Sequence, residues 1–259
     1  MKLFKSIQSY NDYRIEIADK NIGFVPTMGA LHQGHISLVE QSIKNNQVTV
    51  VSIYINPTQF DKANDLNNYP KTLDKDLELL KTSGVDAVFL PSYQEIYPDD
   101  YAFGVKEKQL SHKFCGAHRD GHFDGVLTVV MKLLNIIKPT NAYFGEKDYQ
   151  QLTLIKQMVA AFFLDINIVG CAIIREKDGL AMSSRNIRLT TQQRKKALLL
   201  YQTISSELSL EQMHKKLSSY GFKVDYIEVM NDRLLVAAYL GKIRLIDNIP
   251  LNQKIEQAA

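Results

Sequence analysis

Ile22-Gly-Phe-Val-Pro-Thr-Met-Gly-Ala-Leu-His-Gln-Gly-His-Ile-Ser-Leu38 is the stretch of sequence that decides the fold class. Residues Ile22 to Val25 form a short apolar run typical of a buried parallel strand, and Pro26 to Leu31 end that run in a loop. After this loop, apolar residues recur at helical spacing, at Ile36, Leu38, Val39 and Ile43. The sequence therefore predicts a strand, a loop and a helix, the repeating unit of α/β proteins with a parallel sheet.

Two histidines stand where this helix is expected to begin. His32 and His35 are three residues apart around Gly34, so they share one face of the first turn. A helix N-terminus carries unpaired N–H groups and a positive partial charge, which favour phosphate, and the imidazoles add further donors. Gly29 and Gly34 lack a Cβ atom, so a nucleotide can approach the backbone closely. The alternative is that the histidines only cap or pack the helix, but the strand-loop-helix setting favours a phosphate site.

Composition limits the classes of function. The 259 residues are 45% hydrophobic, enough for a large core in one or two domains, and we expect two of unequal size. A net charge of +3, with no tract of lysine or arginine, does not favour a nucleic-acid binder, but leaves anionic small molecules possible. Cys115 and Cys171 make no disulfide framework, and no run approaches the ~20 apolar residues of a membrane helix. We expect a soluble cytoplasmic protein without nucleic-acid or membrane partners.

Polar side chains follow the next predicted strand. Residues 48–55 are almost all β-branched and apolar, as in a central strand, and they are followed by Asn56 and Gln59. Ligands of open parallel sheets bind beyond the carboxyl ends of the strands, so these amides are placed to hold a hydroxyl or a carboxylate. A plain turn at Asn56-Pro57 is an equal alternative.

The same pattern returns later in the chain. Strands are predicted at 87–90, 142–144 and 166–174, and helices at 1–20, 73–81 and 126–137. After the strand at 142–144, Lys147 could meet a phosphate, Asp148 could accept ribose hydroxyls, and Gln151 lies one helical turn further on. A cluster of this kind is more often a solvated helix start, but its position after a strand favours a site.

The C-terminal part has a different pattern. Ser183, Ser184 and Arg185 place two hydroxyls beside a guanidinium, which suits a triphosphate whose charge moves to departing pyrophosphate. Helices are predicted within 190–220 and short strands at 224–229, 234–239 and 242–246. We therefore divide the chain into a nucleotide-binding domain at 1–174 and a small α+β lid domain at 175–259.

Residues 92–123 are polar and longer than a usual connection, which indicates a functional flap. Cys115, His118 and His122 invite a zinc interpretation, but a structural site needs four ligands, and only the distant Cys171 or His112 could complete it. We favour Arg119 and His122 as polar groups of a loop that covers the substrate, and we predict no resident metal site.

Five segments, taken in order, resemble the motifs of the pantothenate synthetase (pantoate–β-alanine ligase) family. They are Pro26 to His35, Asn56 to Phe60, Gly121 to Val126, Phe144 to Gln151 and Asp178 to Asn186. The resemblance runs from residue 2 to about 250. It implies a Rossmann-like parallel-sheet domain with a smaller C-terminal lid, a homodimer, and a nucleotidyltransferase-type reaction. In that reaction ATP and pantoate form pantoyl adenylate and pyrophosphate, and β-alanine then gives pantothenate and AMP.

The resemblance also implies roles for individual residues. His35 would be the catalytic histidine, Gln59 would contact pantoate and β-alanine, Gln151 would hold pantoate, and Mg²⁺ would accompany ATP. The ATP-binding residues would be Met28, Gly29, Ala30, Leu31, His32, Gln33, Gly34, His35, Gly145, Glu146, Lys147, Asp148, Ile174, Met182, Ser183, Ser184 and Arg185.

The sequence departs from the family pattern at a few positions, among them Thr58, where an apolar residue is common. Two other functions remain as alternatives. One is a nucleotidyltransferase acting on a phosphorylated acceptor, against which Gln59 and Gln151 argue because they add no positive charge. The other is a nucleotide sensor without catalytic activity, and no missing catalytic group favours it.

Overall fold

A computed structural model describes residues 1–251 of the chain. Its contacts divide these residues into two compact units. The N-terminal unit contains residues 1–146 and 150–172, and the C-terminal unit contains residues 147–149 together with the described residues from Ile173 onward. None of the helices formed by residues 1–251 is long and apolar enough to cross a membrane.

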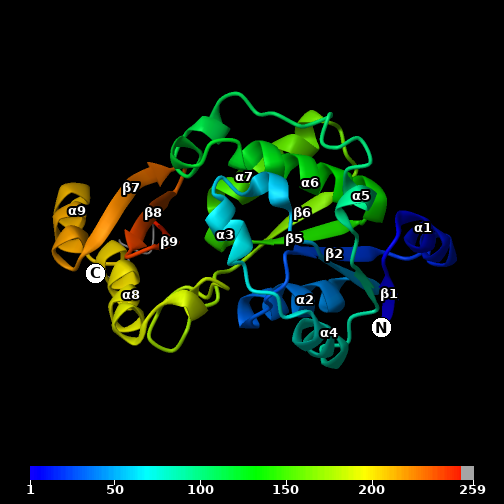
Figure 1. Ribbon diagram of the computed structural model, residues 1–259, viewed down its shortest axis with the longest axis horizontal. Coiled ribbons are helices and arrows are strands. Elements are labelled where there is room, and N and C mark those ends of the chain that lie inside the picture. Colours follow the sequence, from blue (N-terminus) through cyan, green and yellow to red (C-terminus); the bar gives the residue numbers. More distant parts are fainter. Residues whose placement is uncertain (252–259) are drawn as a thin grey trace. The chain divides into compact units, whose positions relative to one another are not determined.

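The N-terminal unit is built on a six-stranded sheet in which every pairing is parallel (Figure 1). The strand order is β1-β4-β3-β2-β5-β6. This arrangement confirms the α/β fold class with a parallel sheet. The strands are β1 (Lys2–Phe4), β2 (Ile22–Thr27), β3 (Val48–Ile53), β4 (Ala87–Phe89), β5 (Asn141–Gly145) and β6 (Asn167–Cys171).

Helices cover both faces of this sheet, with α2 and α4 on one side and α6 and α7 on the other in Figure 1. Every residue of β3 is buried, which explains why its sequence is apolar or small on both faces. The helices are α1 (Ile7–Glu16), α2 (Gln33–Asn45), α3 (Ala63–Asn67), α4 (Leu73–Thr82), α5 (Tyr93–Ile96), α6 (His122–Ile137) and α7 (Tyr149–Ala161). Single 3₁₀ turns are η1 (Pro57–Gln59), η2 (Leu110–His112), η3 (Gly116–His118) and η4 (Glu146–Asp148).

Three elements differ from the sequence-based expectation. The single helix predicted over residues 1–20 is instead strand β1 followed by α1, and the short helix α3 lies where the sequence analysis predicts no helix. β1 has only three residues and pairs with β4 alone, so it is too short to show the alternation of a strand. Helix α6 begins at His122, four residues before the predicted start at Val126.

The C-terminal unit is a three-stranded antiparallel sheet with two helices, which confirms the smaller α+β domain. Its elements are η5 (Asn186–Arg188), α8 (Thr191–Ile204), α9 (Leu210–Ser219), β7 (Phe222–Met230), β8 (Arg233–Leu240) and β9 (Ile243–Pro250). Both helices begin with a capping box, from Thr190 to Gln193 and from Ser209 to Gln212, which satisfies N–H groups of the first turn. Apolar residues of both helices and all three strands form one core, which includes Leu200, Met213, Phe222, Leu234 and Leu245.

Candidate active site

The turn between β2 and α2 fixes both histidines through their Nδ1 atoms. His32 is the N-cap residue of α2, and its Nδ1 accepts a hydrogen bond from Gly34 N at 3.1 Å. The Nδ1 atom of His35 in turn accepts from His32 N at 3.3 Å, which completes a reciprocal capping box. A neutral imidazole whose Nδ1 accepts must carry its proton on Nε2. The fold therefore selects the Nε2–H tautomer for both rings.

A buried carboxylate holds the loop in front of this turn. Asp76, on α4, is 2% exposed, and its two oxygens accept from Ala30 N at 2.9 Å and from Leu31 N at 2.8 Å. Thr72 Oγ1 donates a third hydrogen bond to Asp76 at 3.1 Å. These contacts hold Ala30 at a φ of 52°, a left-handed conformation that non-glycine residues adopt only with support. Asp76 thus shapes the loop that leads to the histidines.

Sequence reasoning missed Asp76, although a signal was present. Leu73, Asp76, Leu77 and Leu80 follow the helical spacing of one face, so a carboxylate stands where the pattern favours an apolar residue. A buried carboxylate needs hydrogen-bond partners, and the adjacent loop supplies two main-chain N–H groups.

The main-chain N–H groups of this loop mostly donate within the protein. Those of Ala30 and Leu31 bond Asp76, those of His32 and Gly34 bond imidazoles, and that of Gly29 bonds Thr27 Oγ1. The sequence argument assumed that such groups would meet a phosphate directly. These five main-chain N–H groups are therefore engaged within the protein.

The segment after β3 is held by a buried amide. Asn56 is 1% exposed, and its Nδ2 donates to Gln59 Oε1 at 3.1 Å and to Gly125 O at 3.2 Å. Its Oδ1 accepts from Tyr97 OH at 2.9 Å and from Thr58 Oγ1 at 3.0 Å. Burial raises the pKa of Tyr97 to about 12, so its hydroxyl remains a donor at neutral pH. Asn56, predicted to hold substrate, instead uses its amide to orient Gln59.

Gln59 is also held from its other side. Its Nε2 donates to Met28 Sδ at 3.1 Å, and its main-chain oxygen lies 2.8 Å from His122 Nδ1. Arg119 Nη1 lies 2.8 Å from His122 Nε2 and can only donate, so His122 accepts at Nε2 and donates from Nδ1. His122 therefore lies in the first turn of α6 and supports the main chain at Gln59, whereas the sequence placed it in a covering loop.

The segment around Cys115, for which the sequence raised a zinc interpretation, is held by Gln150. Cys115 N donates to Gln150 Oε1 at 2.9 Å, and Gln150 Nε2 donates to the main chain at Leu110 and Lys113. Within residues 1–251, no group of three or more His, Cys, Asp or Glu side chains is placed to hold a metal ion.

In the C-terminal unit, a tight chain reversal places Ile174 beside Met182. Met182 N donates to Ile174 O at 3.0 Å, and Arg175 pairs with Ala181 as an antiparallel bridge. The next turn is fixed by Ser183, whose Oγ accepts from Arg185 N at 3.3 Å. The reversal thus joins two segments that the resemblance assigns to ATP, although Ile174 and Met182 are eight positions apart in the sequence.

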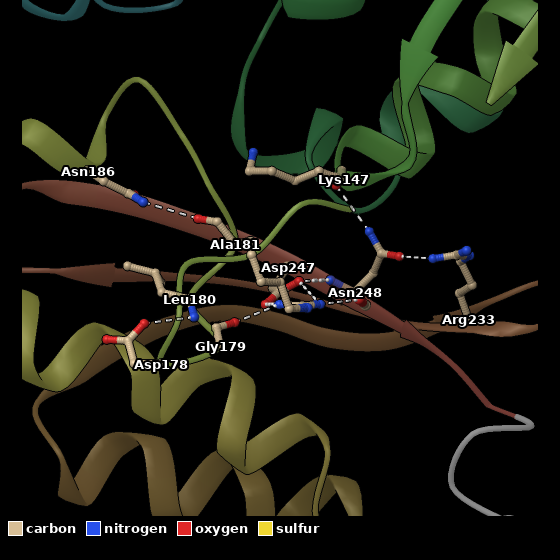
Figure 2. A network of polar contacts seen from close by, with 10 residues as sticks. Lys147, Asp178, Gly179, Leu180, Ala181, Asn186, Arg233, Asp247 and Asn248 are labelled. Atoms are coloured by element: carbon tan, nitrogen blue, oxygen red, sulfur yellow. Dashed lines mark hydrogen bonds and ion pairs between the residues drawn. The ribbon is translucent and has the colours of Figure 1, made fainter. Parts of the chain in front are cut away.

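Lys147 and Asp148 belong to the same C-terminal unit, and they lie in the 3₁₀ turn η4. Lys147 Nζ lies 3.5 Å from Asp148 Oδ2, and the Lys147 side chain is 18% exposed. The main-chain oxygen of Lys147 accepts a hydrogen bond from Asn248 Nδ2 at 3.1 Å (Figure 2). Gln151 lies in the first turn of α7 and belongs to the N-terminal unit.

Comparison with known proteins identifies the family of this chain. The family model described as pantoate-beta-alanine ligase matches residues 2–250. The chain belongs to this family. Among pantoate-beta-alanine ligases, it is 53% identical to the pantothenate synthetase of Bdellovibrio bacteriovorus over 89% of this chain and 92% of the relative. It is 49% identical to that of Legionella pneumophila over 96% of this chain and 99% of the relative.

Solved structures of pantoate-beta-alanine ligases share the whole fold. The enzyme of Francisella tularensis, solved with beta-gamma ATP and beta-alanine, matches with a TM-score of 0.93 and 43% identity, covering 97% of this chain and 98% of that one. The pantothenate synthetase of Thermus thermophilus matches with a TM-score of 0.88 and 36% identity, over 97% of this chain and 99% of that one.

Proposed function

We propose that this enzyme condenses pantoate with β-alanine at the expense of ATP through a pantoyl-adenylate intermediate. The observation that carries the proposal is the match over almost the whole chain to pantoate-beta-alanine ligases, one of them solved with beta-gamma ATP and beta-alanine. In the first step a carboxylate oxygen of pantoate attacks the α-phosphorus of ATP and releases pyrophosphate. In the second step the amine of β-alanine attacks the acyl carbon, loses a proton and releases AMP.

The need for two steps follows from elementary chemistry. A carboxylate and an ammonium group do not condense in water, because the departing oxygen is a poor leaving group. Adenylation attaches AMP to that oxygen, so the oxygen can depart readily as part of AMP. No side chain has to form a covalent bond, which agrees with a site made of histidine, lysine and amide groups.

The proposed roles follow the sequence assignment. His35 is the catalytic histidine, Gln59 binds pantoate and β-alanine, and Gln151 binds pantoate. The ATP-binding residues are 28–35, 145–148, Ile174 and 182–185. We assign residues 1–174 to the nucleotide- and pantoate-binding domain and residues 175–259 to the lid.

The histidine tautomer supports this assignment. Adenylation places extra negative charge on the phosphate oxygens, and a donor aimed at that charge stabilises the transition state. Because Nδ1 of His35 already accepts from His32 N, its Nε2–H is the group that can donate. Lys147 would add a point charge to the same phosphates.

Mg²⁺ enters this proposal as part of the substrate complex. Residues 1–251 hold no cluster of three metal-ligating side chains, so phosphate oxygens and water would supply most of its ligands. We also infer a cytoplasmic homodimer, and this inference rests on the family resemblance.

The test is exchange of labelled pyrophosphate into ATP with Mg²⁺ and pantoate, without β-alanine. Exchange that depends on pantoate would support an acyl-adenylate enzyme. Its absence would contradict the proposal and favour another acceptor, such as a phosphorylated alcohol, or a sensor that binds ATP without reaction.

Variants of His35 and Lys147 sharpen this test. We expect His35→Ala or Lys147→Ala to slow exchange by roughly 10²-fold or more, the usual effect of losing one such donor. His35→Gln should be equally slow but keep a stable α2, because glutamine at this position of a capping box can still accept from the N-cap N–H. An unchanged exchange rate in His35→Gln would mean that His35 takes no part in the adenylation step.

A further inference from the structure

The polar network around β9 reaches a residue of the proposed ATP site. Asn248 is 1% exposed, and its Nδ2 donates to the main-chain oxygen of Lys147 at 3.1 Å (Figure 2). On its other side, Asn248 Oδ1 accepts from Arg233 Nη1 at 2.5 Å. The contact joins residues that are 101 positions apart in the sequence.

The chemistry of the two partners fixes the orientation of this amide. The guanidinium of Arg233 has only donors, so the Asn248 atom that faces it must be the oxygen. The main-chain oxygen of Lys147 only accepts, so the atom that faces it must be the NH₂ group. An asparagine meets both requirements at once, whereas aspartate would direct an acceptor at the Lys147 oxygen.

The main chain of Asn248 is itself firmly held. Its N–H donates to Asp247 Oδ1 at 2.8 Å, and its oxygen accepts from Arg175 Nη2 at 3.3 Å. Arg175 also makes a two-point ion pair with the buried Asp247, at 2.6 and 2.9 Å, and stacks on the Tyr201 ring at 3.8 Å. Burial raises the pKa of Asp247, and the Arg175 pair opposes this shift. The Asn248 side chain therefore donates to Lys147 from a main chain that is itself held by hydrogen bonds.

The segment that carries Lys147 has a second attachment to the same sheet. Tyr149 OH donates to Asp232 Oδ1 at 3.2 Å, and the guanidinium of Arg233 lies 4.9 Å from the centre of the Tyr149 ring. Residues 147–149 are thus held at both ends, which explains why they group with the C-terminal unit although their neighbours in sequence do not.

We propose that Asn248 is a positioning residue that fixes the main chain at Lys147 and so sets the reach of its ammonium group. This inference rests on the role of Lys147 in the proposed reaction. A lysine side chain is long and flexible, so the placement of its Cα decides where Nζ can lie. Donors act on a transition state only within a narrow distance range, and a displacement of about 1 Å can cost 10²-fold in rate.

The experiment is a double-mutant cycle on pantoate-dependent pyrophosphate exchange in the full chain. Asn248→Leu removes the hydrogen bond to Lys147, and Asn248→Asp keeps the size and the acceptor for Arg233 but loses the donor. Each is made in the natural chain and in Lys147→Ala. The matched control is Asp225→Asn, which removes the negative charge from a 2.8 Å ion pair with Arg244 between β7 and β9 of the same sheet.

In the natural chain we expect both Asn248 variants to lower the rate by tenfold to a hundredfold, on the order that misplacement of a catalytic group gives. In Lys147→Ala the same changes should have less than about a twofold effect, because the group that they position is gone. Asp225→Asn should keep the natural rate. Equal effects in both backgrounds, or no effect in the natural chain, would overturn the proposal.

A second readout requires no activity. Acetylation of Lys147 by a small anhydride, followed on its peptide by mass spectrometry, should be faster in both Asn248 variants and unchanged in Asp225→Asn. If the natural chain shows no exchange, the proposed function fails, and this labelling still decides whether Asn248 holds Lys147. Equal labelling of Lys147 in all variants would overturn the inference.

Discussion

Asp76 is the single side chain on which the histidine turn depends most. Asp76→Asn keeps its size but replaces one acceptor with an NH₂ group, which would face the N–H of Ala30 or Leu31. We expect a loss of about 1–3 kcal/mol in the free energy of unfolding, the cost of an unsatisfied buried polar group, and a slower exchange reaction. Urea unfolding and pyrophosphate exchange measure the two effects.

The control for this prediction lies on the same helix. Asp74 is exposed and stands in the same first turn of α4, so Asp74→Asn removes the same charge without touching the loop. It should change stability by a few tenths of a kcal/mol at most, as helix-end charges on a surface do. Equal losses in the two variants would mean that Asp76 acts only through the helix dipole.

Cys171 on β6 should be a slow thiol. Burial, with a smaller contribution from Glu146, raises the pKa of its thiol to about 11. Because the thiolate is the reactive form, only about one molecule in a thousand is reactive at pH 8. In a Cys115→Ser background, iodoacetamide should label Cys171 slowly at pH 8, and the rate should rise about tenfold per pH unit up to pH 10.

The same protein unfolded in urea provides the comparison, because its cysteine regains an ordinary pKa near 8.5. If iodoacetamide labels the folded chain at pH 8 as fast as it labels the unfolded chain, the Cys171 thiol is not protected by the fold.

At the level of elements, the approach of α6 to η1 depends on Gly125. A Cβ atom at this position would lie 2.3 Å from Thr58 O and 2.7 Å from Gln59 Cα, both of them main-chain atoms. Gly125→Ala should therefore push η1 away, cost about 1–3 kcal/mol of stability and raise the KM for pantoate. Thermal unfolding and exchange at varied pantoate concentration measure these effects.

The control is Asn135→Ala, because Asn135 is exposed on the same helix. It tests whether any substitution in α6 raises the KM for pantoate. It should leave the KM for pantoate unchanged. If Gly125→Ala has the same KM for pantoate as the natural chain, η1 can shift without affecting pantoate binding.

The elements show what a sequence pattern can and cannot predict. β3 was predicted from residues 48–55, which are almost all β-branched and apolar, because a strand that is buried on both faces shows its apolar character in its own sequence. β1 was missed, because three residues at the edge of a sheet gain their strand conformation from β4 and not from their own sequence. The start of α6 was misplaced because the polar residues 92–123 were interpreted as a flap, whereas His122 already begins the helix and Gly125 packs closely within it.

For the molecule as a whole, the family assignment leads us to expect a homodimer. Sedimentation equilibrium should therefore give about twice the 29.5 kDa mass of one chain. A mass equal to one chain at micromolar concentration would contradict this expectation.

The candidate site was predictable where neighbours in sequence act together, as His32 and His35 do in their capping box. It was not predictable where the partner comes from a distant part of the chain. Asp76 meets Ala30 across 46 positions, and Asn248 meets Lys147 across 101. The sequence marks Asp76 only as a carboxylate on an apolar helix face and does not indicate its partner, because both side chains meet main-chain atoms that carry no side-chain signal.

The long separation between Lys147 and Asn248 also sets an order of events during protein synthesis. A ribosome that adds 5–20 residues per second needs about 5–20 s to proceed from the lysine to the asparagine. During that interval the parallel sheet can already form, since β6 ends at Cys171. The lysine turn gains its last attachment only after β9 has emerged, so a nascent chain that stalls before this strand carries the sheet without a fixed lysine.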